Sequence, residues 1–326
     1  MPHNIGKNRT DKMSDTTWLI GAGPMSIDYV KVFNALNIPF EVIGRGRVSA
    51  QECASKTGAK VMIGGVESHL FDCSDLPSSV IVAVGIEQLA KVTKLLLQKG
   101  IKRILIEKPG GIDSDEVNSV LAETLKQDAD VYIAYNRRFY SSVLKAQEII
   151  RDDGGVASFN FEFTEWSHQI VGLEKAPGIK ENWLLANSSH VIDLAFFLGG
   201  KPKTMSCYKA GSLDWHPSGS IYAGAGISET GALFSYQANW EAPGRWGVEV
   251  LTKKHRLIFR PLEKLHVQNI GSVKIQEIPI DDDLDTRFKP GLYLQVLAFI
   301  QNDKQGLINI SEHCTNIGFY QMIRNG

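Results

Sequence analysis

Residues 17–26 read TWLIGAGPMS, an apolar run that meets a glycine-rich turn. The run predicts a β-strand ending at Gly21, and the apolar spacing after the turn predicts a helix. In such a strand–turn–helix unit Gly21 permits the tight turn, and Gly23 lets a pyrophosphate approach the N–H groups at the helix start. We therefore expect Gly21, Gly23, Pro24 and Met25 to contact a dinucleotide.

The same alternation continues along the chain. Apolar runs recur at 40–43, 61–63, 80–84, 103–106 and 130–134, with helix-like spacings between them. This pattern is typical of a parallel sheet covered on both faces by helices. Residues 156–164 then alternate apolar and polar, as in an antiparallel strand, and further strands follow. Helices are expected at 182–198, 291–301 and 311–324.

These patterns predict an α/β fold in two parts. An N-terminal Rossmann domain with a doubly wound parallel sheet is expected at residues 15–138. A C-terminal α+β domain with an open, largely antiparallel sheet is expected at residues 139–326. Residues 1–14 are polar, so we expect a flexible leader, with Met13 as an alternative start.

Composition narrows the classes of function. The chain has 326 residues, 43% hydrophobic and 22% charged, and its 35 Lys and Arg against 36 Asp and Glu give a net charge of −1. This balance disfavours a protein built to bind nucleic acid or an anionic membrane, and no apolar stretch reaches the ~20 residues of a spanning helix. The four cysteines form no CxxC pair, so we expect no metal site and a reducing compartment, the cytoplasm.

The end of the second predicted strand bears on the type of cofactor. NAD-preferring folds place an acidic residue there, which binds the ribose 2′-hydroxyl. This strand instead continues into Gly44, Arg45, Gly46 and Arg47, and Glu41 lies inside the strand. Because a guanidinium can bind a 2′-phosphate, we predict NADP(H), with NAD(H) as the second choice and Arg45 as a cofactor ligand. Alternatively, these arginines are solvated loop residues.

Several motifs follow one another as in the Gfo/Idh/MocA family of oxidoreductases, which this chain resembles from about residue 16 to its end. They are the glycine-rich turn, Glu107-Lys108-Pro109, YNRRF at 135–139, SHVID at 189–193 and KPGLY at 289–293. The resemblance implies hydride transfer between a nicotinamide and a sugar, sugar derivative or nucleotide sugar. It also implies a homodimer or homotetramer formed through the open sheet.

The resemblance also assigns roles to individual residues. It implies that His190 is the catalytic acid/base and that Lys108 polarises the reacting oxygen, with Glu107 and Lys108 also near the cofactor. A neutral histidine can accept an alcohol proton near physiological pH. Asn187 and Asp193 lie three positions to either side of His190, so one helix face would carry these supporting residues.

The substrate residues are less determined. Arg137 and Arg138 follow the sixth predicted strand and could bind an anionic substrate group or structural carboxylates. Trp183 could stack against a sugar, as aromatic side chains do, although an aromatic residue here could equally belong to the core.

The chain departs from the family pattern at two places. Ala186 stands where many members carry an aspartate, and Val84-Gly85 replaces the usual Thr-Pro. Two other functions therefore remain open. The protein could use a bound nicotinamide for lyase or hydrolase chemistry, or it could be a non-catalytic sensor that binds the cofactor.

Overall fold

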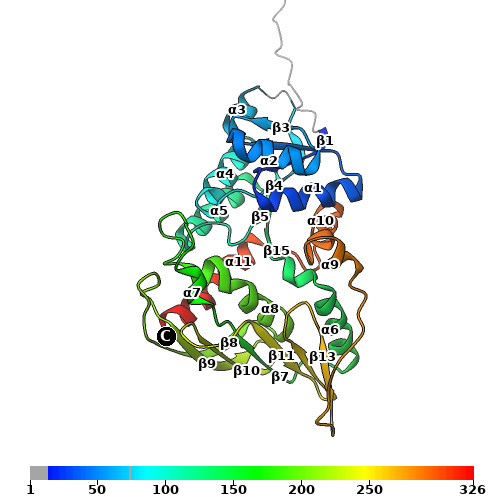
Figure 1. Ribbon diagram of the computed structural model, residues 1–326, viewed down its shortest axis with the longest axis vertical. Helices are drawn as coiled ribbons and strands as arrows, with labels where there is room; N and C mark the ends of the chain where they lie inside the picture. The colour runs from blue at the N-terminus through cyan, green and yellow to red at the C-terminus, as the bar shows by residue number, and fades with distance from the viewer. Residues whose placement is uncertain (1–13, 73–74) are drawn as a thin grey trace, which may run out of the picture.

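The computed structural model describes residues 14–72 and 75–326. The predicted leader, except Ser14, and Cys73 lie outside the described residues. The chain forms two sheets. In Figure 1 the parallel sheet occupies the upper half and the antiparallel sheet the lower end, with helices α8 (Ser189–Gly199) and α11 (Ile310–Asn325) between them.

The N-terminal sheet has seven strands in the order β15-β6-β5-β4-β1-β2-β3. Their bounds are β1 (Ser14–Ile20), β2 (Phe40–Gly44), β3 (Val61–Ile63), β4 (Pro77–Val82), β5 (Arg103–Glu107), β6 (Asp130–Ala134) and β15 (Ile308–Asn309). All neighbours pair in parallel except β15, which runs antiparallel to β6. All six predicted strands of the doubly wound sheet are present, so this part of the predicted fold is confirmed.

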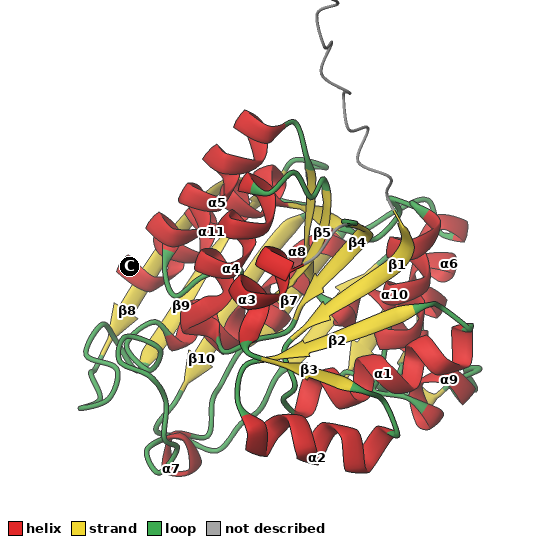
Figure 2. Ribbon diagram, turned by 90° about the horizontal axis from the view of Figure 1, so that it is seen from above, coloured by secondary structure: helices red, strands yellow, loops and turns green. Residues whose placement is uncertain are grey.

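Five helices connect these strands and flank the sheet (Figure 2). They are α1 (Pro24–Leu36), α2 (Arg47–Thr57), α3 (Gly65–Asp72), α4 (Ile86–Gln98) and α5 (Ser114–Gln127). The α5 helix begins at a capping box, since Asp113 Oδ1 accepts from the Glu116 N–H at 2.9 Å and Glu116 Oε2 accepts from the Ile112 N–H at 2.8 Å. The cap therefore fixes the residue at which α5 begins after β5.

The strand order reverses at β1, which lies between β2 and β4. Helix α1 packs with one hydrophobic core through Tyr29, Val30 and Phe33, whereas α4 packs with another through Leu89 and Leu96. Chain segments thus leave the carboxyl ends of β1 and β4 toward opposite faces of the sheet. In open α/β sheets this reversal opens the crevice where ligands bind.

The second sheet has eight strands in the order β14-β13-β12-β11-β7-β10-β9-β8. Their bounds are β7 (Ser158–Glu162), β8 (Pro202–Ala210), β9 (Ile221–Ser228), β10 (Leu233–Asn239), β11 (Gly247–Leu251), β12 (His255–Phe259), β13 (His266–Asn269) and β14 (Ile275–Glu277). Every pair is antiparallel except β7 with β10. The largely antiparallel sheet is therefore confirmed, although the short strand β13 was not predicted.

The helix expected at residues 182–198 is interrupted. Residues Leu184–Ser188 form a π-helical turn, η2, and α8 starts only at Ser189. The alternating phenylalanines of β7 face α8, where Phe159 and Phe161 both meet Phe196 edge to face. Single π-turns frequently occur at functional sites, and η2 directly precedes α8, whose second residue is His190.

The remaining helices lie between the two sheets in the chain, except α7, which follows β7 within the second domain. They are η1 (Asn136–Phe139), α6 (Ser141–Asp152), α7 (Ser167–Ile170), α9 (Asp283–Arg287) and α10 (Leu292–Gln301). Because α10 packs on α1 and β15 pairs with β6, residues after 139 complete the first sheet. In the described part of the chain, no helix combines the length and apolar composition needed to cross a membrane.

Candidate active site

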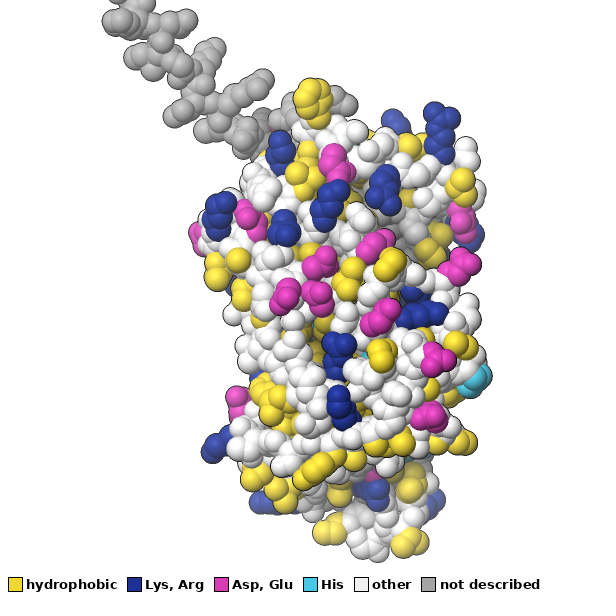
Figure 3. All heavy atoms as spheres, turned by 90° about the vertical axis from the view of Figure 1, so that its left-hand side faces the viewer, with side chains coloured by type: hydrophobic (Ala, Val, Ile, Leu, Met, Phe, Trp, Pro, Cys, Tyr) yellow, Lys and Arg dark blue, Asp and Glu magenta, His cyan; other side chains and the backbone are white. Residues whose placement is uncertain are grey.

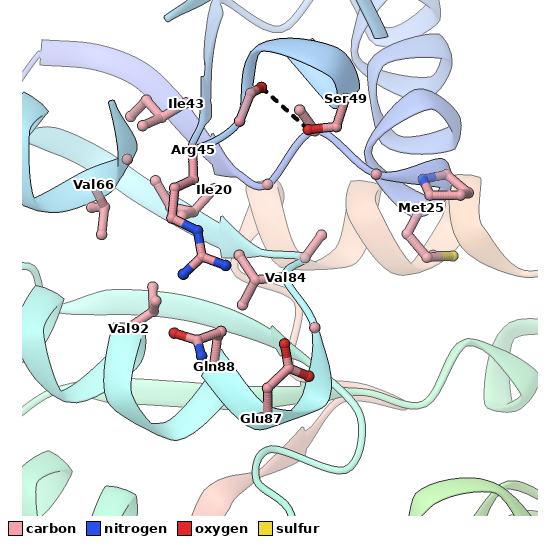
Figure 4. A pocket seen from close by; sticks show the side chains of 18 of the residues that line it. Ile20, Met25, Ile43, Arg45, Ser49, Val66, Val84, Glu87, Gln88 and Val92 are labelled. Carbon is pink, nitrogen blue, oxygen red and sulfur yellow. Dashed lines mark hydrogen bonds between the residues drawn. The ribbon is translucent and has the colours of Figure 1, made fainter. Parts of the chain in front are cut away.

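The glycine-rich turn borders a cavity of about 600 Å³ at the crevice of the first sheet (Figure 4). Gly21 has a φ of +124°, and a Cβ there would collide with the carbonyl oxygen of Ala83. Nothing lies within 4 Å of where a Cβ of Gly23 would stand, and no side chain caps the start of α1. The predicted ligands Gly21, Gly23, Pro24 and Met25 all line the cavity. Its size and its free helix N-terminus fit a dinucleotide.

Arg45 also lines this cavity, and Figure 4 shows its guanidinium pointing inward, toward the side formed by Gln88. Ser49 stands beside it on α2 and donates to the Gly46 carbonyl at 3.3 Å. Glu41, the acid within β2, is not a lining residue and faces His69 at 3.6 Å. The end of β2 therefore presents a cation and a hydroxyl to the cavity.

Several lining residues escaped the sequence analysis. They follow β2, β3 and β4 or lie on α4: Ser49, Gly65, Val66, Glu67, Ala83, Glu87, Gln88 and Val92. The signal that could have found them is their position at the carboxyl ends of neighbouring parallel strands. Val84 and Gly85, noted as departures from the family pattern, form part of the same wall.

Lys108 follows β5 at the same edge of the sheet. Its Nζ donates to the Ala186 carbonyl oxygen in η2 at 2.6 Å. Burial lowers the pKa of Lys108 to about 8, and the neighbouring Glu107 partly opposes this shift. Glu107 accepts from the Tyr29 hydroxyl of α1 at 2.7 Å, which ties the end of β5 to α1. Neither Glu107 nor Lys108 lines the 600 Å³ cavity.

His190 is buried in the first turn of α8. Its ring meets Tyr135 edge to face at 5.8 Å between centroids and Trp246 at 6.1 Å. Its buried Nδ1 has no hydrogen-bond partner among the described residues. Burial, together with the charges of Arg137 and Lys108, holds the pKa of His190 well below its ordinary value. The structure thus brings Lys108 close to a neutral imidazole.

Asn187 is held by a carboxylate that the sequence analysis missed. Its Nδ2 donates to both oxygens of Glu165, at 3.0 and 3.2 Å, and the Ser188 hydroxyl donates to Glu165 at 2.7 Å. Arg245 completes the group at 3.3 Å. Glu165 is 1% exposed, and burial raises its pKa. Glu165, which follows β7, therefore holds η2 in place through Asn187 and Ser188. Asn187 comes directly after Ala186, whose carbonyl oxygen accepts from Lys108.

Asp193 does not support His190 in the expected way. Both of its carboxylate oxygens accept from Arg138, at 2.8 and 2.7 Å, in a pair that is nearly inaccessible to solvent. The Arg138 guanidinium also lies 4.6 Å from the ring centroid of Phe197. Arg138 thus binds a structural carboxylate, one of the two alternatives expected for it, and both carboxylate oxygens of Asp193 face Arg138 in the interior.

The other two substrate candidates differ in their surroundings. Trp183 is buried and meets Trp215 edge to face at 6.1 Å, so it belongs to the core and is not placed to stack on a sugar. Arg137 is half-buried, with its guanidinium 4.9 Å from the ring centroid of Trp246. Arg137 and His190 therefore share Trp246 as a neighbour.

The KPGLY segment also gains a physical role. Lys289 Nζ donates to the Met25 sulfur of the glycine-rich turn at 3.0 Å, and its charge acts on Lys108 and His190. Gly291 has a φ of +73°, and a Cβ there would collide with the Asn136 carbonyl oxygen. The segment thus contacts η1 through Gly291 and the wall of the cofactor cavity through Lys289. Among the described residues, no three His, Cys, Asp or Glu side chains are grouped so that they could hold a metal ion.

Solved structures resemble this chain over nearly its full length. The UDP-N-acetylglucosamine 3-dehydrogenase GnnA from Acidithiobacillus ferrooxidans matches with a TM-score of 0.72 and 13% identity, over 95% of this chain and 96% of that one. Levoglucosan dehydrogenase, in complex with NADH and L-sorbose, matches with a TM-score of 0.75 and 17% identity, over 96% of both chains. An oxidoreductase from Desulfitobacterium hafniense described as NADPH-dependent matches with a TM-score of 0.74 and 16% identity, over 95% and 94%.

The comparisons by sequence give no further assignment, since no protein-family model and no curated protein matches this chain. At 13 to 17% identity the structural matches establish the fold. This chain therefore shares the two-sheet fold of these solved structures.

Proposed function

We propose that this protein is a nicotinamide-dependent oxidoreductase that acts on a hydroxyl or carbonyl carbon of a sugar, sugar derivative or nucleotide sugar. The observation that carries the proposal is that Lys108, after β5, and the glycine-rich cavity lie at the same edge of one parallel sheet, while His190 of α8 lies against Tyr135, which follows β6, and within reach of the Lys108 charge. Two structural neighbours are dehydrogenases of UDP-N-acetylglucosamine and of levoglucosan, which supports a substrate of the sugar class.

The two proposed catalytic residues have complementary charge states. Because its pKa is depressed, His190 is neutral at physiological pH and can accept the hydroxyl proton; since Nδ1 is buried, we assign Nε2 as the acceptor. With a pKa of about 8, Lys108 is mostly protonated at pH 7. One of its N–H groups binds the Ala186 carbonyl, which leaves two to polarise the reacting oxygen. A bound nicotinamide supplies or accepts the hydride.

The test of this function measures the absorbance of reduced nicotinamide across a panel of sugars and nucleotide sugars. Lys108→Met and His190→Asn are each expected to lower turnover by about 10²- to 10⁴-fold, the usual contribution of a positioned acid or base. Binding of NADPH should stay unchanged. His266→Asn on β13, near the far edge of the second sheet, is the matched control.

Other outcomes would point elsewhere. Full activity in both variants would overturn these roles. Substrate conversion without net cofactor reduction would indicate a lyase or hydrolase. Cofactor binding with no turnover on any compound would indicate a sensor.

The cofactor we propose is NADP(H), on the strength of Arg45 and Ser49 at the end of β2. A charged hydrogen bond contributes about 1.5–3 kcal/mol, so Arg45→Gln should weaken NADPH binding about 10- to 100-fold and leave NADH binding nearly unchanged. Isothermal titration with both cofactors measures this difference. Tighter binding of NADH by the unaltered protein would contradict the assignment.

We also propose self-association through the second sheet. Its outward face carries exposed apolar side chains on three adjacent strands: Tyr208 on β8, Ile227 on β9 and Leu233 on β10 are 69%, 42% and 61% exposed. Figure 3 shows hydrophobic side chains gathered along this lower end of the molecule. Light scattering should find a dimer or tetramer that Leu233→Lys dissociates.

The cytoplasm is the compartment we propose, since Cys53, Cys207 and Cys314 are free thiols.

A further inference from the structure

Arg137 is a half-buried cation without an ion-pair partner among the described residues. It lies in η1, directly before Arg138, and no carboxylate among the described residues forms an ion pair with it. Its Nε is buried without a hydrogen-bond partner. Removing a charge from water without a counter-charge is costly, and enclosed charges are normally paired, so Arg137 is available to an anion from outside the chain.

The neighbours of Arg137 do not neutralise it. Its guanidinium lies over the rings of Trp246 and Tyr140, at 4.9 and 6.0 Å from their centroids. The buried carboxylate whose charge acts on Arg137, Glu165, is already bound by Arg245, and Glu263 is solvent-exposed and outside ion-pair distance.

Positive charge also surrounds the proposed reaction centre. Lys108, Arg245 and Lys289 act electrostatically on Arg137 or on His190. The negative charges that act on these cations are Glu165 and Glu107, and Glu107 already accepts a hydrogen bond from the Tyr29 hydroxyl. An additional anion at this place would therefore be stabilised by several cations at once.

The positions of Arg137 and His190 indicate that this anion would be part of the substrate. Both side chains lie against Trp246, with the imidazole centroid at 6.1 Å and the guanidinium carbon at 4.9 Å from the indole centroid. An anion bound to Arg137 would thus lie beside the imidazole that we propose to accept the substrate proton. A guanidinium binds carboxylate and phosphate oxygens through paired N–H donors.

We propose that Arg137 binds an oxyanion of the substrate, so that the preferred substrates are sugar acids or sugar phosphates and not neutral sugars. This inference rests on the proposed function, since it assumes that the substrate reacts at His190. It goes further in naming the chemical group that the substrate carries and the residue that selects it.

The first experiment measures anion binding alone. The full-length protein, saturated with NADPH so that the cofactor cavity is filled, is titrated with acetate and with inorganic phosphate while tryptophan fluorescence is recorded. A saturable change is expected with at least one of them, and the stronger one distinguishes a carboxylate from a phosphate. Arg137→Met should weaken this binding about 10- to 100-fold, as expected for loss of a charged hydrogen-bond donor.

Arg151→Met is the matched control, because it removes the same charge from an exposed position on α6. It should bind both anions as the unaltered protein does. The thermal midpoint of ligand-free Arg137→Met should equal or exceed that of the unaltered protein, because a half-buried charge without an ion-pair partner is removed. A structural role for Arg137 would instead lower that midpoint.

The second experiment compares glucose, glucuronate and glucose 6-phosphate as substrates and as ligands of the NADP⁺ complex. The charged compounds should bind more tightly, and Arg137→Met should abolish the preference. Hydride transfer with neutral sugars only, or a preference unchanged in Arg137→Met, would overturn this inference while the proposed function stands. Anion binding that depends on Arg137 without any hydride transfer would overturn the proposed function instead. Absence of any anion binding also refutes the inference.

Discussion

Replacement of Asp193 by asparagine tests the buried ion pair between α8 and η1. Asp193 and Arg138 are 1% and 5% exposed and form two hydrogen bonds of 2.8 and 2.7 Å. Removing one partner of such a pair leaves the other charge buried, which typically costs about 3–5 kcal/mol. Since the amide oxygen introduced by the substitution could still accept one hydrogen bond from Arg138, we expect Asp193→Asn to lower the free energy of unfolding by about 3 kcal/mol, near the lower end of that range.

The double variant Arg138→Met with Asp193→Leu provides the decisive comparison. It removes both charges, so its loss should be well below the sum of the single losses, about 0–2 kcal/mol. Urea unfolding followed by circular dichroism of the unaltered protein, the single variants Arg138→Met and Asp193→Leu and the double variant gives the coupling energy. A loss below about 1 kcal/mol in Asp193→Asn, or additive losses in the double variant, would refute the argument that this pair holds α8 to η1.

Three further predictions concern the site and its frame. Hydroxyl oxidation should slow as the pH rises through about 8, where Lys108 loses its proton, and Lys108→Arg should move this limb of the kcat/KM profile to higher pH. Gly21→Ala should abolish cofactor binding and lower the thermal midpoint, because its Cβ collides with a backbone carbonyl; Gly231→Ala, with a similar positive φ and no neighbour within 4 Å, controls for backbone strain alone. Burial alone would raise the pKa of Asp153, but hydrogen bonds from Thr252 and His255 lower it. The stability from this carboxylate is present above the ordinary pKa of aspartate and is lost as the pH falls through the lowered value, so the difference in thermal midpoint between the unaltered protein and Asp153→Asn should shrink in acid.

The cofactor cavity was largely predictable from the sequence. Apolar runs, turn glycines and helical spacing are local properties of the chain. Gly21, Gly23, Pro24, Met25 and Arg45 all line the cavity for that reason. The residues after β3 and β4 were missed because their part in the cavity depends on which strands become neighbours.

The interrupted helix before His190 shows where local reasoning ends. The apolar spacing of residues 182–198 is helical throughout, yet η2 departs from the α-helical pattern. Two distant side chains engage that turn: Lys108 binds the Ala186 carbonyl, and Glu165 binds Asn187. No periodicity in the segment itself reports these contacts.

By itself, the sequence determined the strand–turn–helix unit, the doubly wound sheet and the residues at its glycine-rich turn, since each depends on neighbours a few positions away. Only the tertiary structure decided between Arg137 and Arg138, which are adjacent and chemically identical. Arg138 is neutralised by Asp193, 55 positions further along the chain, whereas Arg137 points to the rings of Tyr140 and Trp246 and has no carboxylate within ion-pair distance in the described part of the chain. The sequence gives the charge of a side chain, but whether an opposite charge neutralises it depends on which residues the fold places beside it.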